Sequence, residues 1–316
     1  VSVPAVEAAG LFCGLLAVAA HAVLDFNLYI LPIAILAGLA FGWLRDMGVT
    51  AEAYDPLVGG GIGALIRPET QLILLESPGS ITFEVQDVPA ITAMARGRGV
   101  ATLLDNTWAA SLLFKGHAAG CDLVMQSLTK YVGGHSDLVA GGCLGPADLI
   151  DRIRSLRNIM GTITDPHTAW MLLRSLETLH LRMERAGANA RVVCEWLRDH
   201  PAVERVGYLG FVEPGSRQAD IYARHCLGAG STFSLYLKGG EAEAFHFLDA
   251  LKLVKLAVSL GGTESLASHP AAMTHLSVAR ERKAALDIGD NMVRISIGVE
   301  HPDDLIADFA QALAAV

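Results

Sequence analysis

Two apolar segments that each end in polar, chemically active side chains constrain this fold most. Residues 100–104 (VATLL) have a buried-strand pattern and lead into Asp105, and residues 121–126 (CDLVMQ) lead into a hydroxyl-rich turn that carries Lys130. Two strands of one parallel sheet would deliver the acid and the amine to the same edge. In open α/β sheets, ligands bind outside the carboxyl ends of the strands.

These side chains match the requirements of pyridoxal 5'-phosphate. Lys130 has the amine that bonds the cofactor's aldehyde, Asp105 has the anion that keeps its ring nitrogen protonated, and Ser127 and Thr129 have hydroxyls for its phosphate. A lone lysine is usually a solvated surface charge, and a lone aspartate after a strand is usually a helix cap. Their combination favours the cofactor site.

The surrounding motifs resemble those of the trans-sulfuration enzymes, the family of cystathionine β-lyase, cystathionine γ-synthase and methionine γ-lyase. They are residues 75–80 (LESPGS), 104–109 (LDNTWA) and 127–131 (SLTKY), and the resemblance runs from about residue 44 to the C-terminus. It implies an α/β chain with the fold type I of PLP-dependent transferases, as in aspartate aminotransferase. A truncated large domain would hold a mostly parallel sheet, beside a smaller α+β C-terminal domain.

The resemblance divides the chain into residues 1–44, a PLP-binding large domain at 45–176 and a small domain at 177–316. Strand, helix and strand at 71–76, 85–98 and 100–104 predict a βαβ unit with parallel strands. A long helical region starts at Asp165 and Pro166 and runs toward Trp196. The last third predicts strands at 231–237, 255–259 and 292–297, and helices at 241–251 and 302–315.

Three smaller features have structural interpretations. Residues 55–63 (DPLVGGGIG) lack the Lys-Ser/Thr of a phosphate loop, so they are expected to form a turn that opens a helix. His135 is expected to be a hydrogen-bonded turn residue. Asp303 and Asp304 fall in the first turn of the closing helix, where the helix dipole favours acids.

The resemblance also supplies the substrate-binding residues. Ser259 and Arg294 match family positions that hold the substrate's α-carboxylate, and a guanidinium fork suits a carboxylate. The substrate would be a sulfur-containing amino acid: Lys130 takes its α-proton, and a sulfur leaving group departs.

The motifs give mixed indications about the reaction. Residues 75–80 and Trp108 resemble the β-lyases, which favours β-elimination at a C–S bond of cystathionine-like amino acids. Residues 259–266 and 269–275 resemble cystathionine γ-synthases and methionine γ-lyases, and these activities remain alternatives.

The N-terminal segment differs in composition from the rest. Residues 8–24 and 28–44 are almost free of charge, each within the length range of a membrane-spanning helix, and residues 21–28 (HAVLDFNL) weakly resemble O-antigen ligases or polymerases. Membrane contact through residues 1–44 is therefore expected, with a pair of buried helices as the alternative. The segment lacks the features of a cleavable signal peptide.

In the family, the region that precedes residue 44 holds a Tyr-x-Arg pair, a glycine-containing phosphate loop and a tyrosine that stacks on the cofactor ring. None of these can be placed in residues 1–44, which contain no arginine. Three hypotheses follow: a PLP-dependent carbon–sulfur lyase, a catalytically impaired fragment or fusion, and a membrane-anchored protein that functions through its N-terminal segment.

Composition excludes some partners and favours others. The chain has 24 Lys and Arg against 33 Asp and Glu, a net charge of −9, a pI near 5.6, and no basic run, so nucleic acid is not an expected partner. Five scattered cysteines indicate a reduced, cytoplasmic protein, and eleven histidines show no metal-ligand spacing, so no metal is predicted. The resemblance implies a homotetramer, a dimer of dimers whose sites are shared between subunits.

Overall fold

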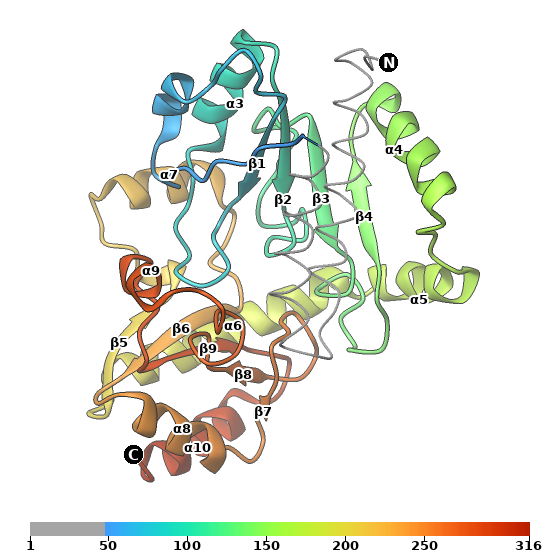
Figure 1. Ribbon diagram of the computed structural model, residues 1–316. Coiled ribbons are helices and arrows are strands. Elements are labelled where there is room, and N and C mark those ends of the chain that lie inside the picture. The colour runs from blue at the N-terminus through green and yellow to red at the C-terminus, as the bar shows by residue number, and fades with distance from the viewer. Residues whose placement is uncertain (1–47) are drawn as a thin grey trace.

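The computed structural model describes residues 48–316, in which two β-sheets are connected through the long helix α6, Leu179–Arg198 (Figure 1). The first sheet has the order β1-β2-β3-β4 and the second the order β5-β6-β9-β8-β7. The predicted membrane contact of residues 1–44 lies outside the described residues. No helix between residues 48 and 316 has the length and apolar character needed to cross a membrane.

The first sheet confirms the predicted βαβ unit. Strands β1, β2 and β3 pair in parallel, and β4 pairs antiparallel with β3, so the sheet is mixed. Helix α3 starts later than predicted because Asp87 caps it, accepting a hydrogen bond from Ala90 N at 3.3 Å. The bounds are Leu72–Glu76 (β1), Val88–Gly97 (α3), Ala101–Asp105 (β2), Leu123–Ser127 (β3) and Gly141–Leu144 (β4).

Helices cover both faces of this sheet (Figure 1). Leu104 and Val124 belong to the apolar core that includes α3, whereas Leu103 and Leu123 face α4, Ala147–Met160. Successive strand residues point to opposite faces, so a strand buried on both sides is apolar throughout. This explains the continuous apolar run that led into Asp105.

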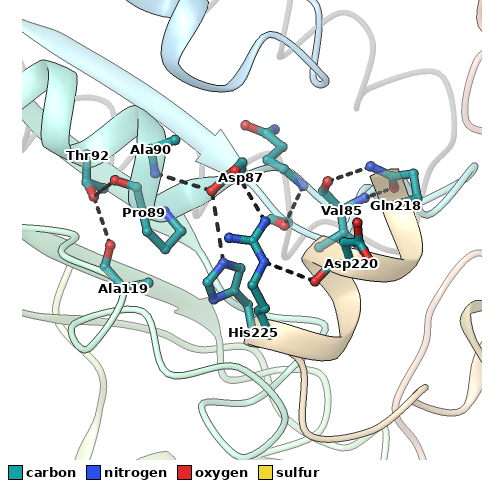
Figure 2. A network of polar contacts seen from close by, with 12 residues as sticks. Val85, Asp87, Pro89, Ala90, Thr92, Ala119, Gln218, Asp220 and His225 are labelled. Atoms are coloured by element: carbon teal, nitrogen blue, oxygen red, sulfur yellow. Dashed lines mark hydrogen bonds and ion pairs between the residues drawn. The ribbon is translucent and has the colours of Figure 1, made fainter. Parts of the chain in front are cut away.

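Helix α7, Arg217–His225, packs on the same core as α3 (Figure 2). Gln218 exchanges two hydrogen bonds with the main chain of Val85, at 2.7 and 2.9 Å. Asp87 lies 3.6 Å from the Arg224 guanidinium and 4.0 Å from the His225 ring. The domain boundary after residue 176 stays a prediction, and α7 shows that a segment beyond that boundary packs on the first sheet.

The predicted helical region after Asp165 is two helices rather than one. Helix α5, Pro166–Leu176, begins where the Asp165 carboxylate accepts hydrogen bonds from His167 N and Thr168 N at 2.9 and 3.0 Å. The chain leaves helical geometry at Thr178, before α6 begins.

The second sheet confirms the strands and helices predicted for the last third. Helices α6, α8 and α10 cover one face, against which Phe233, Leu235, Val293 and Ile295 pack. The intervening residues face the other side, toward the first sheet, and Ser234 Oγ donates a hydrogen bond to Ile81 O at 2.6 Å. The bounds are Val203–Gly207 (β5), Thr232–Leu237 (β6), Glu241–Ala250 (α8), Lys255–Leu256 (β7), Leu266–Ser268 (β8), Met292–Ser296 (β9) and Pro302–Leu313 (α10).

The three smaller structural interpretations are also confirmed. The glycine-rich segment opens a short 3-10 helix, η1, Gly59–Ala64. His135 Nδ1 lies 2.7 Å from Gly133 O, within the turn. Asp303 and Asp304 lie in the first turn of α10.

Candidate active site

The carboxyl ends of β1, β2 and β3 place Glu76, Asp105 and Ser127 along one edge of the first sheet. Glu76 pairs in register with Asp105 on the neighbouring strand. Thr107 then links the ends of β2 and β3, because its main-chain N–H donates to Asp105 Oδ1 at 2.9 Å and its hydroxyl accepts from Ser127 N at 2.8 Å. The acid and the hydroxyl-rich turn therefore share an edge, as the sequence predicts.

Lys130 is held in the turn that follows β3. Its main-chain N–H donates to Ser127 O at 3.2 Å, and the residue is 5 % exposed. Its amine Nζ donates to Ser259 Oγ at 3.1 Å, which joins two predicted site residues 129 positions apart. Burial to this extent is unusual for a lysine, which mostly lies at the surface.

Arg294 lies on the polar face of the second sheet, next to the same loop. Its Nη2 donates to Val258 O at 2.8 Å and to Ser259 O at 3.4 Å. Burial lowers the pKa of Arg294 to about 10, partly offset by Tyr131 and Glu76, so the guanidinium stays charged at neutral pH. Lys130, Ser259 and Arg294 thus form one cluster, although Arg294 could not be distinguished from a surface charge by its own sequence pattern.

Ser127 and Thr129 occupy the turn between β3 and Lys130. Ser127 is buried, and its main-chain N–H is held by Thr107. The Thr129 hydroxyl donates to Ala140 O at 3.2 Å and accepts from Ala140 N at 3.0 Å, which fixes the turn against the start of β4. Binding of the cofactor's phosphate by these two hydroxyls stays a prediction.

Glu76 is a member of this cluster that sequence reasoning did not single out. Burial and, secondly, the neighbouring Asp105 carboxylate raise its pKa from the ordinary value of 4.5 to about 7, against the lowering effects of Ser80 and Arg294. The residue nevertheless has accessible surface. The sequence contained the information needed to find it, because Glu76 is the acid that ends the apolar strand β1, just as Asp105 ends β2.

Glu76 makes the stability of the cofactor-free protein depend on pH. The folded state keeps a proton on Glu76 up to about pH 7, whereas the unfolded chain releases it near the ordinary value of 4.5, so stability declines between these values. We expect Glu76→Gln to remove this decline and to raise the free energy of unfolding by about 1 kcal/mol at about pH 8, after discounting for solvent screening. Urea unfolding across this pH range measures the effect.

Glu69→Gln is the matched control, because Glu69 is an exposed carboxylate outside this cluster. It should leave the pH dependence of unfolding unchanged. Equal slopes for the Glu76 variant and the parent chain would contradict the assignment.

The donor set of this edge fits pyridoxal phosphate. A ring nitrogen that carries a proton would offset the adjacent carboxylates Glu76 and Asp105, a buried primary amine is present at Lys130, and Arg294 offers a cation for a substrate carboxylate. Glu76 and Asp105 lie at the carboxyl ends of parallel strands, where α/β sheets bind ligands.

Comparisons with known proteins agree with this geometry. The profile of the family described as "Cys/Met metabolism PLP-dependent enzyme" matches residues 11–314. An L-methionine γ-lyase of Pseudomonas putida is 38% identical over 286 residues, covering 89% of this chain and 71% of its own length. A cystathionine β-lyase of Escherichia coli K12 is 38% identical over 279 residues, covering 86% and 69%.

A solved structure shows the same fold. The cystathionine γ-lyase from Micromonospora echinospora superposes with a TM-score of 0.83 at 34% identity, over 89% of this chain and 74% of its own. The family match begins at residue 11, so it includes most of the segment that resembled a membrane protein, and no comparison supports that membrane resemblance. The chain belongs to the PLP-dependent enzymes of Cys/Met metabolism, which are carbon–sulfur lyases with pyridoxal 5'-phosphate as their cofactor.

Proposed function

We propose that this chain catalyses β-elimination at the C–S bond of cystathionine-like amino acids. The observation that carries the proposal is the contact between Lys130 Nζ and Ser259 Oγ, because it places a buried amine beside the carboxylate receptor Arg294. A substrate whose α-carboxylate lies on Arg294 would hold its α-carbon within reach of Lys130.

The residues of the site have separate roles in this proposal. Arg294 and Ser259 hold the substrate carboxylate, and Lys130 takes the proton from the α-carbon. Asp105 keeps a proton on the ring nitrogen, and Ser127 and Thr129 donate hydrogen bonds to the phosphate, for which the Thr129 hydroxyl gives up its bond to Ala140 O. When bound, pyridoxal phosphate supplies the electron sink for the negative charge that develops at the α-carbon.

Two features bear on the choice between β- and γ-elimination. Ser80, near which the γ-enzymes of the family carry an asparagine, hydrogen-bonds to Glu76 through its side chain and main chain. Residues 76–86 contain no asparagine, and this absence supports the β-reaction. Methionine γ-lyase and cystathionine γ-synthase activities remain the alternatives, supported by residues 259–266 and 269–275.

Product identity tests this proposal. The purified chain with added pyridoxal phosphate is incubated with cystathionine and, separately, with methionine. We expect pyruvate and homocysteine from cystathionine, and little turnover of methionine, because methionine has its sulfur on Cγ. Formation of 2-oxobutyrate from either substrate would support γ-elimination instead. No product from either, with no visible absorbance, would support the catalytically impaired fragment.

We also propose that the chain self-associates. Ile159 and Ile163, at and after the end of α4, are 83% and 58% exposed, and Trp170 and Leu173 on α5 are 57% and 67% exposed. Apolar side chains gathered on neighbouring helices are typical of interfaces. Sedimentation analysis of the chain beside Leu173→Glu should show an oligomer that the variant weakens. A monomer for the parent chain would contradict this.

We place the enzyme in the cytoplasm. None of the four cysteines within residues 48–316 forms a disulfide, which is typical of a reducing compartment. Cell fractionation that recovers the chain only with membranes would contradict this and favour the function through the N-terminal segment.

A further inference from the structure

Arg182 of α6 is bonded to the turn that carries Lys130. Its Nη1 donates to Tyr131 O at 2.6 Å and its Nη2 donates to Val132 O at 3.2 Å. These are the two carbonyls that directly follow Lys130 in the chain. Hydrogen bonds from a charged donor are stronger than those between neutral groups, so this contact fixes the main chain of the turn.

The same guanidinium is anchored from the other side. Its Nη2 also donates to Ser175 O at 2.9 Å, in the last turn of α5, and its Nε donates to Thr178 Oγ1 at 3.1 Å, in the break between α5 and α6. Burial lowers the pKa of Arg182, and the guanidinium still keeps its charge, as arginines do in proteins. The break in the helical region thus brings the guanidinium to the turn.

Gly134 makes this close approach possible. It has a φ of +72°, and a Cβ on it would lie 2.0 Å from Arg182 Nη1. An alanine here would strain the backbone and displace the guanidinium. Gly134 therefore offers a second way to break the contact without altering Arg182.

The turn that Arg182 holds is also hydrogen-bonded to the loop that contains Ser259 and Thr263. Gly134 N donates to Lys130 O at 2.7 Å, and Gly134 O accepts from Thr263 N at 2.9 Å. The same turn and loop make a second contact, in which Lys130 Nζ donates to Ser259 Oγ. A shift of the turn would therefore move the amine relative to its partner.

We infer that Arg182 is a positioning residue for Lys130: it holds the turn at residues 130–134 so that the amine stays beside Ser259 and Arg294. The expected effect on kcat rests on the proposed function. The expected effect on the structure of the turn does not, because it is measured in the cofactor-free protein. Misplacement of a reacting group by a small distance is sufficient to slow a reaction greatly, so the effect should fall on kcat.

The test compares Arg182→Ala, Arg182→Lys and Gly134→Ala, with Arg185→Ala as matched control. Arg185 lies one turn further along α6, is exposed and contacts Glu300 O only at 3.5 Å. In the cofactor-free protein, hydrogen exchange at the amides of Gly133 and Gly134 should become about tenfold faster for Arg182→Ala and Gly134→Ala. Arg182→Lys should give an intermediate rate, and Arg185→Ala the parent rate.

In the enzyme with cofactor, Arg182→Ala and Gly134→Ala should lower kcat by about 10–100-fold with KM changed by less than about twofold. Low concentrations of guanidinium ion should restore part of kcat for Arg182→Ala but not for Gly134→Ala, where the cavity is absent. Unchanged exchange at residues 133–134, or faster exchange spread evenly over α6, would overturn the inference. Loss of turnover in the parent chain would instead refute the proposed function, and exchange would still decide the role of Arg182.

Discussion

Lys130→Ala is expected to abolish both cofactor attachment and turnover. The parent chain mixed with pyridoxal phosphate should develop a visible absorption band that the variant lacks, because Lys130 has the buried amine in the turn after β3. Elimination should fall by about 10³-fold or more, since the same amine moves the α-proton. Absorption spectra and product assays measure the two effects.

The variant should still fold. Main-chain hydrogen bonds hold the turn at this position, from Lys130 N to Ser127 O at 3.2 Å and from Gly134 N to Lys130 O at 2.7 Å, and alanine keeps both. Thermal unfolding followed by circular dichroism verifies this. Lys238→Ala is the control, because Lys238 is exposed at the end of β6. A visible band of parent intensity in Lys130→Ala would exclude Lys130 as the attachment residue.

The local part of this site was predictable from the sequence. Asp105 and Lys130 each follow an apolar strand within a few residues, and parallel pairing alone brings such strand ends together. The same reasoning applied to β1 would have identified Glu76. Only the motif context separated these residues from ordinary caps and surface charges.

The parts that depend on tertiary contacts were not predictable in this way. Arg294 alternates with Val293 and Ile295 on β9, a pattern shared by many strands with one solvated face, so its role came from the family resemblance. The contact of Arg182 with Tyr131 joins residues 51 apart and depends on the break between α5 and α6. A continuous helix, as the sequence predicted, would have placed this side chain differently.

Several elements had weak sequence signals for physical reasons. Helix α4 has no buried residue. Strand β5 lies at the edge of its sheet with two exposed positions, and β8 is only three residues long. The spacing of apolar residues along the sequence cannot identify elements that are this short or that lie at a sheet edge.

Asp105→Asn should leave the site's shape unchanged and remove the charge that the reaction needs. The amide oxygen can still accept the hydrogen bond from Thr107 N that Asp105 Oδ1 accepts at 2.9 Å. It cannot keep a proton on the cofactor's ring nitrogen, so we expect kcat to fall by about 10²–10³-fold, the effect of removing one preorganised charged group. Visible absorbance with pyridoxal phosphate should persist, because Lys130 is intact, and this separates Asp105 from Lys130.

A second effect of Asp105→Asn appears without cofactor. The Asp105 carboxylate raises the pKa of Glu76, so the amide should lower that pKa below about 7 and move the pH-dependent loss of stability to lower pH.

Asp122→Asn is the matched control at the opposite end of the strands, where the carboxylate accepts hydrogen bonds from Thr102 N and Oγ1 at 2.8 and 2.7 Å. It should reduce stability by about 1–3 kcal/mol, because the amide replaces charge-assisted bonds, and leave kcat unchanged. If both variants reduced kcat equally, the loss would reflect general destabilisation of the sheet. A parent-like kcat for Asp105→Asn would remove the Asp105 charge from the reaction, since the amide has no negative charge and one of its two polar atoms is a donor.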